Sequence, residues 1–201
     1  MAYAQALFWT DFETTGLPKG NDFSGVHILE VAVIITNFDL QPLTGYKEVI
    51  AMTRTAAEAI KGNDYVKNMH TKNGLIAASV AAARSESPHT TADVEGELLD
   101  LIRENTTFGK GEFMIAGSGV AAYDHPLIKE KMPRLAEYLA YYPLDIGIQR
   151  RMALILAGNR ELVNPTPRSY QDGQKEHRAW EDVQAHIEEA RRWMEFYREL
   201  P

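Results

Sequence analysis

The sequence predicts one α/β domain with a mixed β-sheet of five strands and helices packed on its faces. Near the N-terminus the chain holds three β-type runs joined by short links, which favours an antiparallel meander. Further along, two short β-type runs alternate with helical stretches, as expected of an α/β domain. A length of 201 residues suits a single domain that spans residues 1–201.

The five strands are predicted from apolar and β-branched runs. The apolar residues 6–9 lead into the first strand, and residues 27–36 are rich enough in Ile and Val to predict a buried central strand. Residues 45–52 form the third run of the meander. Two shorter runs, residues 112–116 and 144–146, complete the predicted sheet.

The helices are predicted from capping residues and from the period of their apolar positions. Two Ala-rich stretches, residues 55–60 and 74–84, are joined by a polar link at 61–73, and Thr91 can cap the next helix. Three helices have a recognisable apolar face, made in turn by Val94, Leu98, Leu101 and Ile102, by Ile148, Met152 and Ile155, and by Val183, Ile187, Ala190, Met194 and Tyr197.

Helix-breaking residues divide the second half of the chain. A short helix is expected to open at Asp124 and to be broken at Pro133, and Gly158 is expected to end the helix that carries Ile148. Residues 158–176 have no apolar period, and a loop of that length in a compact domain is usually functional or mobile.

The composition excludes several classes of protein. A net charge of −7 argues against a broad basic surface for long duplex nucleic acid, although an acidic pocket loaded with metal could still hold a few phosphates. No apolar run reaches eighteen residues, and residues 1–5 lack the basic region of a signal peptide. The absence of cysteine excludes disulfides and thiolate zinc sites, so we expect a cytoplasmic protein with no membrane contact.

Two acids at the end of the first strand are the first candidates for chemistry. Asp11 and Glu13 are two residues apart, so on a strand their side chains share a face and repel each other. A cation between them would remove that cost, and carboxylate oxygens suit Mg²⁺ or Mn²⁺. A solvated strand end is the alternative for such a pair taken alone.

Three later residues could join the same site. Asp124 follows the fourth predicted strand, and His177 and Asp182 flank the start of the closing helix. Five residues is not a same-face helical spacing, so we expect His177 on the loop and Asp182 in the first helical turn. Taken singly, Asp124 could cap a helix, Asp182 could favour a helix N-terminus and His177 could be an ordinary surface or core residue.

The whole pattern resembles the DEDDh group of 3′→5′ exonucleases, which have a ribonuclease-H-like fold. Their first motif matches residues 11–16, their second supplies Asp124, and their third supplies His177 and Asp182. Within that group the chain is most similar to the oligoribonuclease branch, through residues 68–75, 132–135, 141–145 and 192–200. The four-acid pattern is specific for the group, and the surrounding stretches are moderately specific for the branch.

The resemblance implies a two-metal mechanism. Asp11, Glu13, Asp124 and Asp182 would hold two divalent cations, Mg²⁺ or Mn²⁺, one activating water and one stabilising the leaving 3′-oxygen. Four carboxylates and two such ions sum to a charge near zero. His177 would take the proton from the attacking water, because an imidazole titrates near working pH. For Asp145, near the same sheet edge, we expect a supporting role.

The resemblance also implies how substrate and partner bind. The residues that it assigns to substrate binding are Thr14, Leu17, Tyr65, His70 and Tyr141. Leu17 would wedge against a base, and Tyr65 and His70 would stack on the terminal nucleotides, since every base has a π-face. Core packing is the alternative for Leu17 and Tyr65. Tyr141 matches a tyrosine that reaches the site of a partner protomer, which implies a homodimer.

Two departures leave the substrate open. Tyr65 stands where oligoribonucleases usually have tryptophan, and residues 119–123 lack the serine and glutamine that would hold a 5′ phosphate. The pair Thr14-Thr15 is also common in proofreading exonucleases. We therefore expect an exoribonuclease acting on short RNA with a free 3′ end. The alternatives are a single-stranded DNA exonuclease of the proofreading type and a non-catalytic ribonuclease-H-like binding module.

Overall fold

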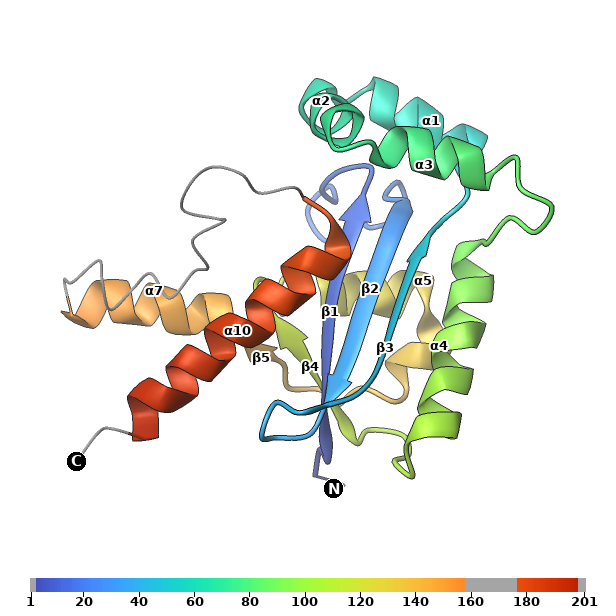
Figure 1. Cartoon of the computed structure of the whole chain (residues 1–201). Coiled ribbons are helices and arrows are strands. Elements are labelled where there is room, and N and C mark those ends of the chain that lie inside the picture. Colours follow the sequence, from blue (N-terminus) through green and yellow to red (C-terminus); the bar gives the residue numbers. More distant parts are fainter. Residues whose placement is uncertain (1–2, 158–176, 199–201) are drawn as a thin grey trace.

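The computed structural model describes residues 3–157 and 177–198, and its centre is a sheet of five strands (Figure 1). The strands are β1 Ala6–Thr14, β2 Ile28–Thr36, β3 Pro42–Val49, β4 Phe113–Gly117 and β5 Leu144–Asp145. Their order in the sheet is β3-β2-β1-β4-β5. The first three strands pair antiparallel, whereas β4 runs parallel to β1 and β5 parallel to β4. The predicted mixed five-stranded sheet, with its antiparallel meander, is confirmed.

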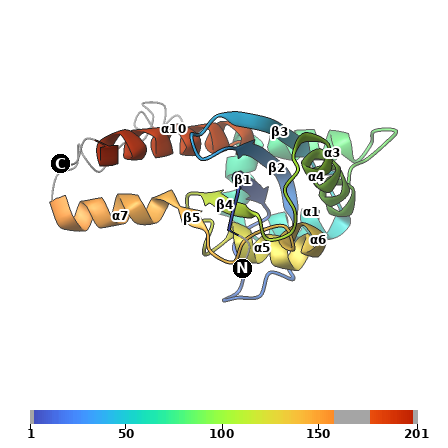
Figure 2. The same ribbon diagram turned by 90° about the horizontal axis from the view of Figure 1, so that it is seen from below.

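Helices lie on both faces of this sheet and across one end of it (Figures 1 and 2). The helix α10 crosses one face, α4 and α5 lie on the other, and α1 to α3 sit beyond the end of β1 where its acids lie (Figure 1). The helices of the described residues are α1 Arg54–Lys61, α2 Asp64–Lys72, α3 Leu75–Ala82, α4 Thr91–Asn105, α5 Asp124–Lys131, α6 Pro133–Ala136, α7 Ile146–Ala157 and α10 Ala179–Arg198.

The alternation of side chains along β1 builds two separate cores. Phe8 and Phe12 belong to the larger cluster, together with buried residues of α4 and α5. Leu7 and Trp9 belong to a second cluster under α10. Because side chains alternate between faces, the odd-numbered Asp11 and Glu13 also point to the face that α10 covers. The packing pattern of β1 therefore directs both acids toward α10.

Two predicted segments differ from the structure. The predicted polar link at residues 61–73 contains the helix α2, capped by the side chain of Asn63 and burying only Val66 and His70. Because α2 buries only two residues, its apolar stripe is too short to stand out among the polar residues around it. The third strand occupies Pro42–Val49 rather than residues 45–52.

The predicted face of α4 needs two smaller corrections. Its cap is Thr90 in a capping box with Asp93, one residue before the predicted Thr91. Its buried face includes Leu99 beside Val94, Leu98 and Ile102, whereas the predicted Leu101 is only partly buried.

The helices α7 and α10 extend side by side away from the sheet (Figure 2). An ion pair between the partly exposed Arg150 and the buried Glu189 joins them. The predicted apolar face of α7 is exposed, since Ile148, Met152 and Ile155 are 47%, 46% and 76% accessible. In α10 the predicted Tyr197 is half exposed, and Trp193 is buried instead.

The predicted helix end at Gly158 and the predicted loop at residues 158–176 lie outside the described residues. Among the helices that are described, none is both long and apolar enough to span a bilayer.

Candidate active site

Asp11 and Glu13 lie near the C-terminal end of β1, where the sheet register holds them next to β2. Asp11 pairs with Ala32 and Glu13 pairs with Glu30, and the register shifts between Glu13 and Thr14. Glu13 is buried, whereas Asp11 is partly accessible. The two carboxylates thus lie at the rim of the sheet, where Glu13 is enclosed by the protein and Asp11 is partly open to solvent.

The start of α10 brings His177 and Asp182 to the same rim. Asp182 is buried, and its backbone N–H donates to the carbonyl of Arg178 at 3.1 Å, which places it in the first helical turn as predicted. His177 precedes the helix with a left-handed φ of 48°. That conformation costs a non-glycine residue roughly 1–3 kcal/mol, so surrounding contacts must hold it.

Asp124 begins α5 and is buried close to β1. Burial, together with the smaller effect of the charge of Asp145, raises the pKa of its carboxyl to about 7, although hydrogen bonds from the backbone N–H groups of Asp124 and Phe12 oppose the shift. Gly117, at the end of β4, lets the chain that leads to Asp124 pass close to β1. A Cβ at that position would lie 2.6 Å from Cγ1 of Val120, so a larger residue would push the loop that carries Asp124 away.

Asp145 supports the loop between β4 and α5. Its carboxylate is buried and accepts the backbone N–H groups of Gly119 at 3.0 Å, Ala121 at 3.3 Å and Gly147 at 3.0 Å. These three hydrogen bonds fix the path of the chain into Asp124. Asp145 therefore acts on the geometry of the site from behind it.

Three predicted residues converge closely enough to hold a metal ion. Glu13, His177 and Asp182 each offer one ligand atom, and these atoms lie within 4.8 Å of one another. Carboxylate oxygens and one imidazole nitrogen suit a divalent cation. Asp124 lies outside this group of three, but it is a buried carboxyl with a raised pKa, whose ionised form a cation would stabilise. The residues present therefore fit a divalent metal centre.

His70 lies behind Glu13 and has no accessible surface. Its Nε2 is 3.0 Å from the carbonyl oxygen of Thr14 and 3.8 Å from Oε2 of Glu13. Burial lowers the pKa of His70, with the Thr14 carbonyl opposing the shift, so the ring is neutral at pH 7. A fully buried ring offers no face to a base, and the structure thus gives His70 a different position from the one that stacking requires.

The other predicted substrate-binding residues divide into exposed and buried ones. Leu17, Tyr65 and Tyr141 are 82%, 73% and 77% accessible, so core packing, the alternative for Leu17 and Tyr65, is excluded. Thr14 is buried, with its Oγ1 2.5 Å from the hydroxyl of Tyr123, which also donates to the carbonyl of Gly16 at 2.9 Å. Tyr123 thereby ties the turn before Leu17 to the start of α5.

Sequence reasoning missed three residues that border His177. Glu30 is buried on β2 and binds the guanidinium of Arg178 through Nε at 2.9 and 3.0 Å and through Nη2. Asn73 donates from Nδ2 to the carbonyl of His177 at 2.7 Å. Glu30 and Arg178 are 148 residues apart in the sequence, so no local spacing indicates the pair.

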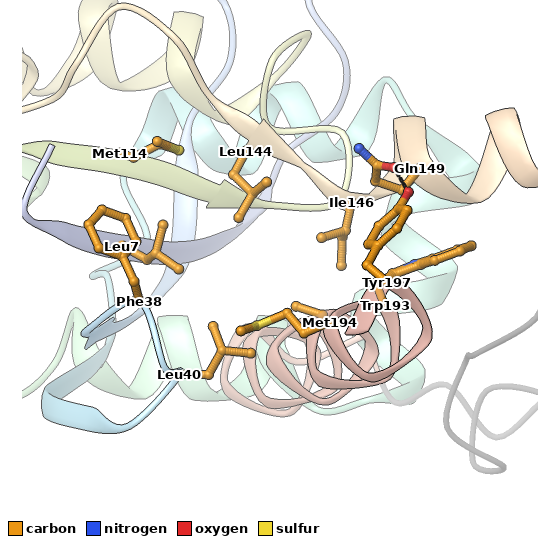
Figure 3. A pocket seen from close by; sticks show the side chains of 11 residues that line it. Leu7, Phe38, Leu40, Met114, Leu144, Ile146, Gln149, Trp193, Met194 and Tyr197 are labelled. Atoms are coloured by element: carbon orange, nitrogen blue, oxygen red, sulfur yellow. Dashed lines mark hydrogen bonds between the residues drawn. The ribbon is translucent and has the colours of Figure 1, made fainter. Parts of the chain in front are cut away.

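A separate apolar pocket of about 320 Å³ lies further along α10 (Figure 3). Its edge carries a hydrogen bond of 2.6 Å from Tyr197 to Gln149. Its lining is Leu7, Phe38, Leu40, Met114, Leu144, Ile146, Gln149, Ala190, Trp193, Met194 and Tyr197. From Asp182 to Ala190 the helix rises about 12 Å, so this pocket lies apart from the acids.

The sheet order fits the ribonuclease-H-like fold, and the acids at its rim form a group that could hold a divalent metal ion. A profile of the exonuclease family matches residues 8–190. The oligoribonuclease of Haemophilus ducreyi is 30% identical over 97% of this chain and 93% of its own length. The oligoribonuclease of Neisseria meningitidis serogroup B is also 30% identical, over 95% and 91%. The chain therefore belongs to the exonuclease family, as its motifs predict, and it is a 3′→5′ exonuclease.

Solved structures support the fold. Exonuclease I from Methylocaldum szegediense superposes with a TM-score of 0.63 at 17% identity, over 98% of this chain and 42% of that one. A zinc-bound complex of E. coli Exonuclease I with single-stranded DNA gives a TM-score of 0.59 at 14% identity, with the same coverage. The chain thus spans less than half of these larger proteins, and at such identities the likeness concerns the fold alone.

Proposed function

We propose that this exonuclease degrades short RNA from a free 3′ end to nucleoside 5′-monophosphates, acting as one domain over residues 1–201. The observation that carries the proposal is the convergence of Glu13, His177 and Asp182 within 4.8 Å at the rim of the sheet. The oligoribonuclease name of relatives that align along nearly the whole chain supports short RNA as substrate.

The four acids would hold two divalent cations, Mg²⁺ or Mn²⁺. Asp11 and Glu13 come from β1, Asp124 from α5 and Asp182 from α10. Bound ions of this type lower the pKa of water and stabilise an oxygen leaving group. Carboxylates of three different elements must keep their places for this to work. The hydrogen bonds of Asp145 and the burial of Asp182 supply that rigidity.

His177 would accept the proton of the attacking water. Its ring is only partly buried, at the edge of the carboxylate cluster, so it can reach both the site and solvent. A neutral imidazole is a suitable base near pH 7. Asp182, held in the first helical turn, would remain fixed while the base exchanges protons.

Leu17 and Tyr65 would contact the terminal nucleotides. Both are highly exposed, and both lie within two residues of a close approach, since a Cβ at Gly16 would be 2.9 Å from Nδ2 of Asn63. Thr14 would shape the floor of this site through Tyr123, and His70 would support it from behind rather than stack.

Tyr141 would reach the site of a second copy in a homodimer. Its side chain is 77% exposed, and its ring packs edge-on against Tyr142 with 4.9 Å between centroids. We expect light scattering to show a dimer. We also expect Tyr141→Ala to raise KM without loss of the dimer. A monomer at working concentration would contradict this part of the proposal.

The substrate is tested with 5′-labelled RNA and DNA oligomers of two to twenty-four nucleotides, with Mn²⁺ and then with EDTA. We expect metal-dependent shortening from the 3′ end that is fastest on the shortest RNA. Asp11→Ala and Asp182→Ala should abolish turnover, whereas Asp93→Ala, at the exposed cap of α4, should not. Faster trimming of long DNA would instead assign a proofreading substrate, and no cleavage with any metal would leave only a binding module.

The proposed place of action is the cytoplasm. A chain without cysteine keeps its fold in that reducing setting. Fractionation of cells that express the tagged chain should recover the activity with cytoplasmic markers, and recovery with membranes would contradict this.

A further inference from the structure

Glu30 anchors the segment that carries His177 to the central sheet. The carboxylate of Glu30 binds the guanidinium of Arg178 at 2.9 and 3.0 Å and also accepts the backbone N–H of Ala179 at 3.0 Å. These are the two residues that follow His177 directly. A buried carboxylate thus holds both the side chain and the backbone of the chain next to the base.

Glu30 also lies next to Glu13, one of the proposed metal-binding acids. Glu30 is the cross-strand partner of Glu13 in the register of β1 and β2. Directly opposed residues of an antiparallel pair share a face, with Cβ atoms about 5 Å apart. The position of His177 relative to Glu13 is therefore fixed through one rung of the sheet.

Asn73 holds His177 from the other side. Its Nδ2 donates to the carbonyl of His177 at 2.7 Å, while its Oδ1 accepts the backbone N–H of Leu75 at 3.0 Å. The peptide of His177 is thus gripped between the end of α2 and the Glu30 anchor. Such contacts on both sides are what a left-handed φ of 48° at a non-glycine residue requires.

We propose that Glu30, through Arg178, and Asn73 are positioning residues that hold His177 in the orientation needed for proton transfer. The proposal rests on the proposed role of His177 as the base. The cation of Arg178 also balances the charge of Glu30, which would otherwise repel Glu13 on the same face. The pair sets the geometry of the base without adding net charge to the metal-binding acids.

The chain offers a matched control in Glu95. This residue is 4% exposed, as is Glu30, and it binds Nε of Arg134 at 2.8 Å and the backbone N–H groups of Arg134 and Leu135 at 2.7 and 3.2 Å. It has the same chemistry on the opposite face of the sheet, where it joins α4 to α6. Glu95→Gln therefore reports the cost of weakening such an anchor away from the site.

The test compares Glu30→Gln, Asn73→Asp and Glu95→Gln in the wild-type chain and in a His177→Ala background, with Mn²⁺ and short RNA. Asn73→Asp removes the donor to His177 but keeps the acceptor for Leu75. We expect Glu30→Gln and Asn73→Asp to lower kcat by at least tenfold, with KM and the half-saturating Mn²⁺ concentration unchanged within twofold. Glu95→Gln should leave kcat within twofold. In the His177→Ala background neither positioning variant should lower the residual rate further.

Each contrary result has a distinct meaning. An unchanged kcat in Asn73→Asp and Glu30→Gln, or an equal loss in the His177→Ala background, overturns the positioning role while the exonuclease function stands. A tenfold higher Mn²⁺ requirement would overturn it too, because the variants would then act through the metal-binding acids. A wild-type rate in His177→Ala would instead refute the base itself, and the positioning role would fall with it.

Discussion

Replacing Asp124 by asparagine should stabilise the metal-free protein at neutral pH. Burial raises the pKa of this carboxyl from 3.8 to about 7, which means that the fold favours its neutral form. A group whose pKa is raised on folding binds a proton more tightly in the folded state, so stability falls as the pH rises. The asparagine side chain keeps the shape and carries no charge, so Asp124→Asn removes this dependence.

The magnitude follows from the shift. Below pH 4 the carboxyl is protonated in both states and costs nothing, and between pH 4 and 7 the penalty grows by about 1.4 kcal/mol per unit. Above pH 7 the difference between a pKa of 3.8 in the unfolded chain and about 7 in the folded protein corresponds to roughly 4 kcal/mol, an upper limit for the gain in Asp124→Asn.

The assay is urea unfolding in EDTA at pH 4, 6 and 8 for the wild type and for Asp124→Asn. The variant should be no more stable at pH 4 and clearly more stable at pH 8, and Mn²⁺ should raise the stability of the wild type alone. Asp93→Asn is a control of opposite sign, since hydrogen bonds from Thr90 lower the pKa of Asp93 and its contribution is lost as the pH falls. A difference between wild type and Asp124→Asn that does not change with pH would refute the reasoning.

Three further predictions test the surroundings of the site. Tyr123→Phe removes the hydroxyl that holds residues 14–16, so the free energy of unfolding in urea should fall by about 1–2 kcal/mol and KM should rise. An unchanged KM would show that Tyr123 has no role in substrate binding. Leu17→Ala, at an exposed side chain, should leave the melting temperature unchanged while raising KM for dinucleotides, and a lower melting temperature would contradict this. Glu189→Ala removes a buried carboxylate from its ion pair with the partly exposed Arg150 and should cost about 1–3 kcal/mol in urea unfolding. Glu188→Ala, at an exposed ion pair, should cost under about 1 kcal/mol, and equal losses would refute the role of burial.

The parts of the fold that the sequence predicted are those with a strong local period. The strand at residues 27–36 is apolar at almost every position, and β2 occupies Ile28–Thr36 with every residue buried. The segment Asp64–Lys72 is mostly polar, so its short buried stripe of Val66 and His70 and its cap at Asn63 did not lead to the prediction of a helix. The exposed stripe of α7 shows the converse, since periodicity identified the helix but not what would cover its apolar face.

The candidate site divides in the same way. Asp11, Glu13, Asp124, His177 and Asp182 could be named because their order and spacing repeat a family motif, and the fold brings Glu13, His177 and Asp182 together. Glu30 belongs to no such spacing, and Asn73 lies in the stretch 68–75 that supports the resemblance but had no role assigned to it. The contacts of both residues with the start of α10 exist only once the chain has folded. For His70 the resemblance supplied a role in stacking, but spacing carries no information on burial.

The charges around the site explain why a metal would be bound there rather than a second basic side chain. The cation of Arg178 is matched by Glu30, and burial keeps His70 neutral, so neither changes the sum of the four acids. The raised pKa of Asp124 measures the cost of burying a negative charge at this point. Two divalent cations would remove that cost, which links the affinity for metal directly to the energy stored in the apo site. A protein that relieved the same cost with its own lysine or arginine would be more stable and would bind no metal.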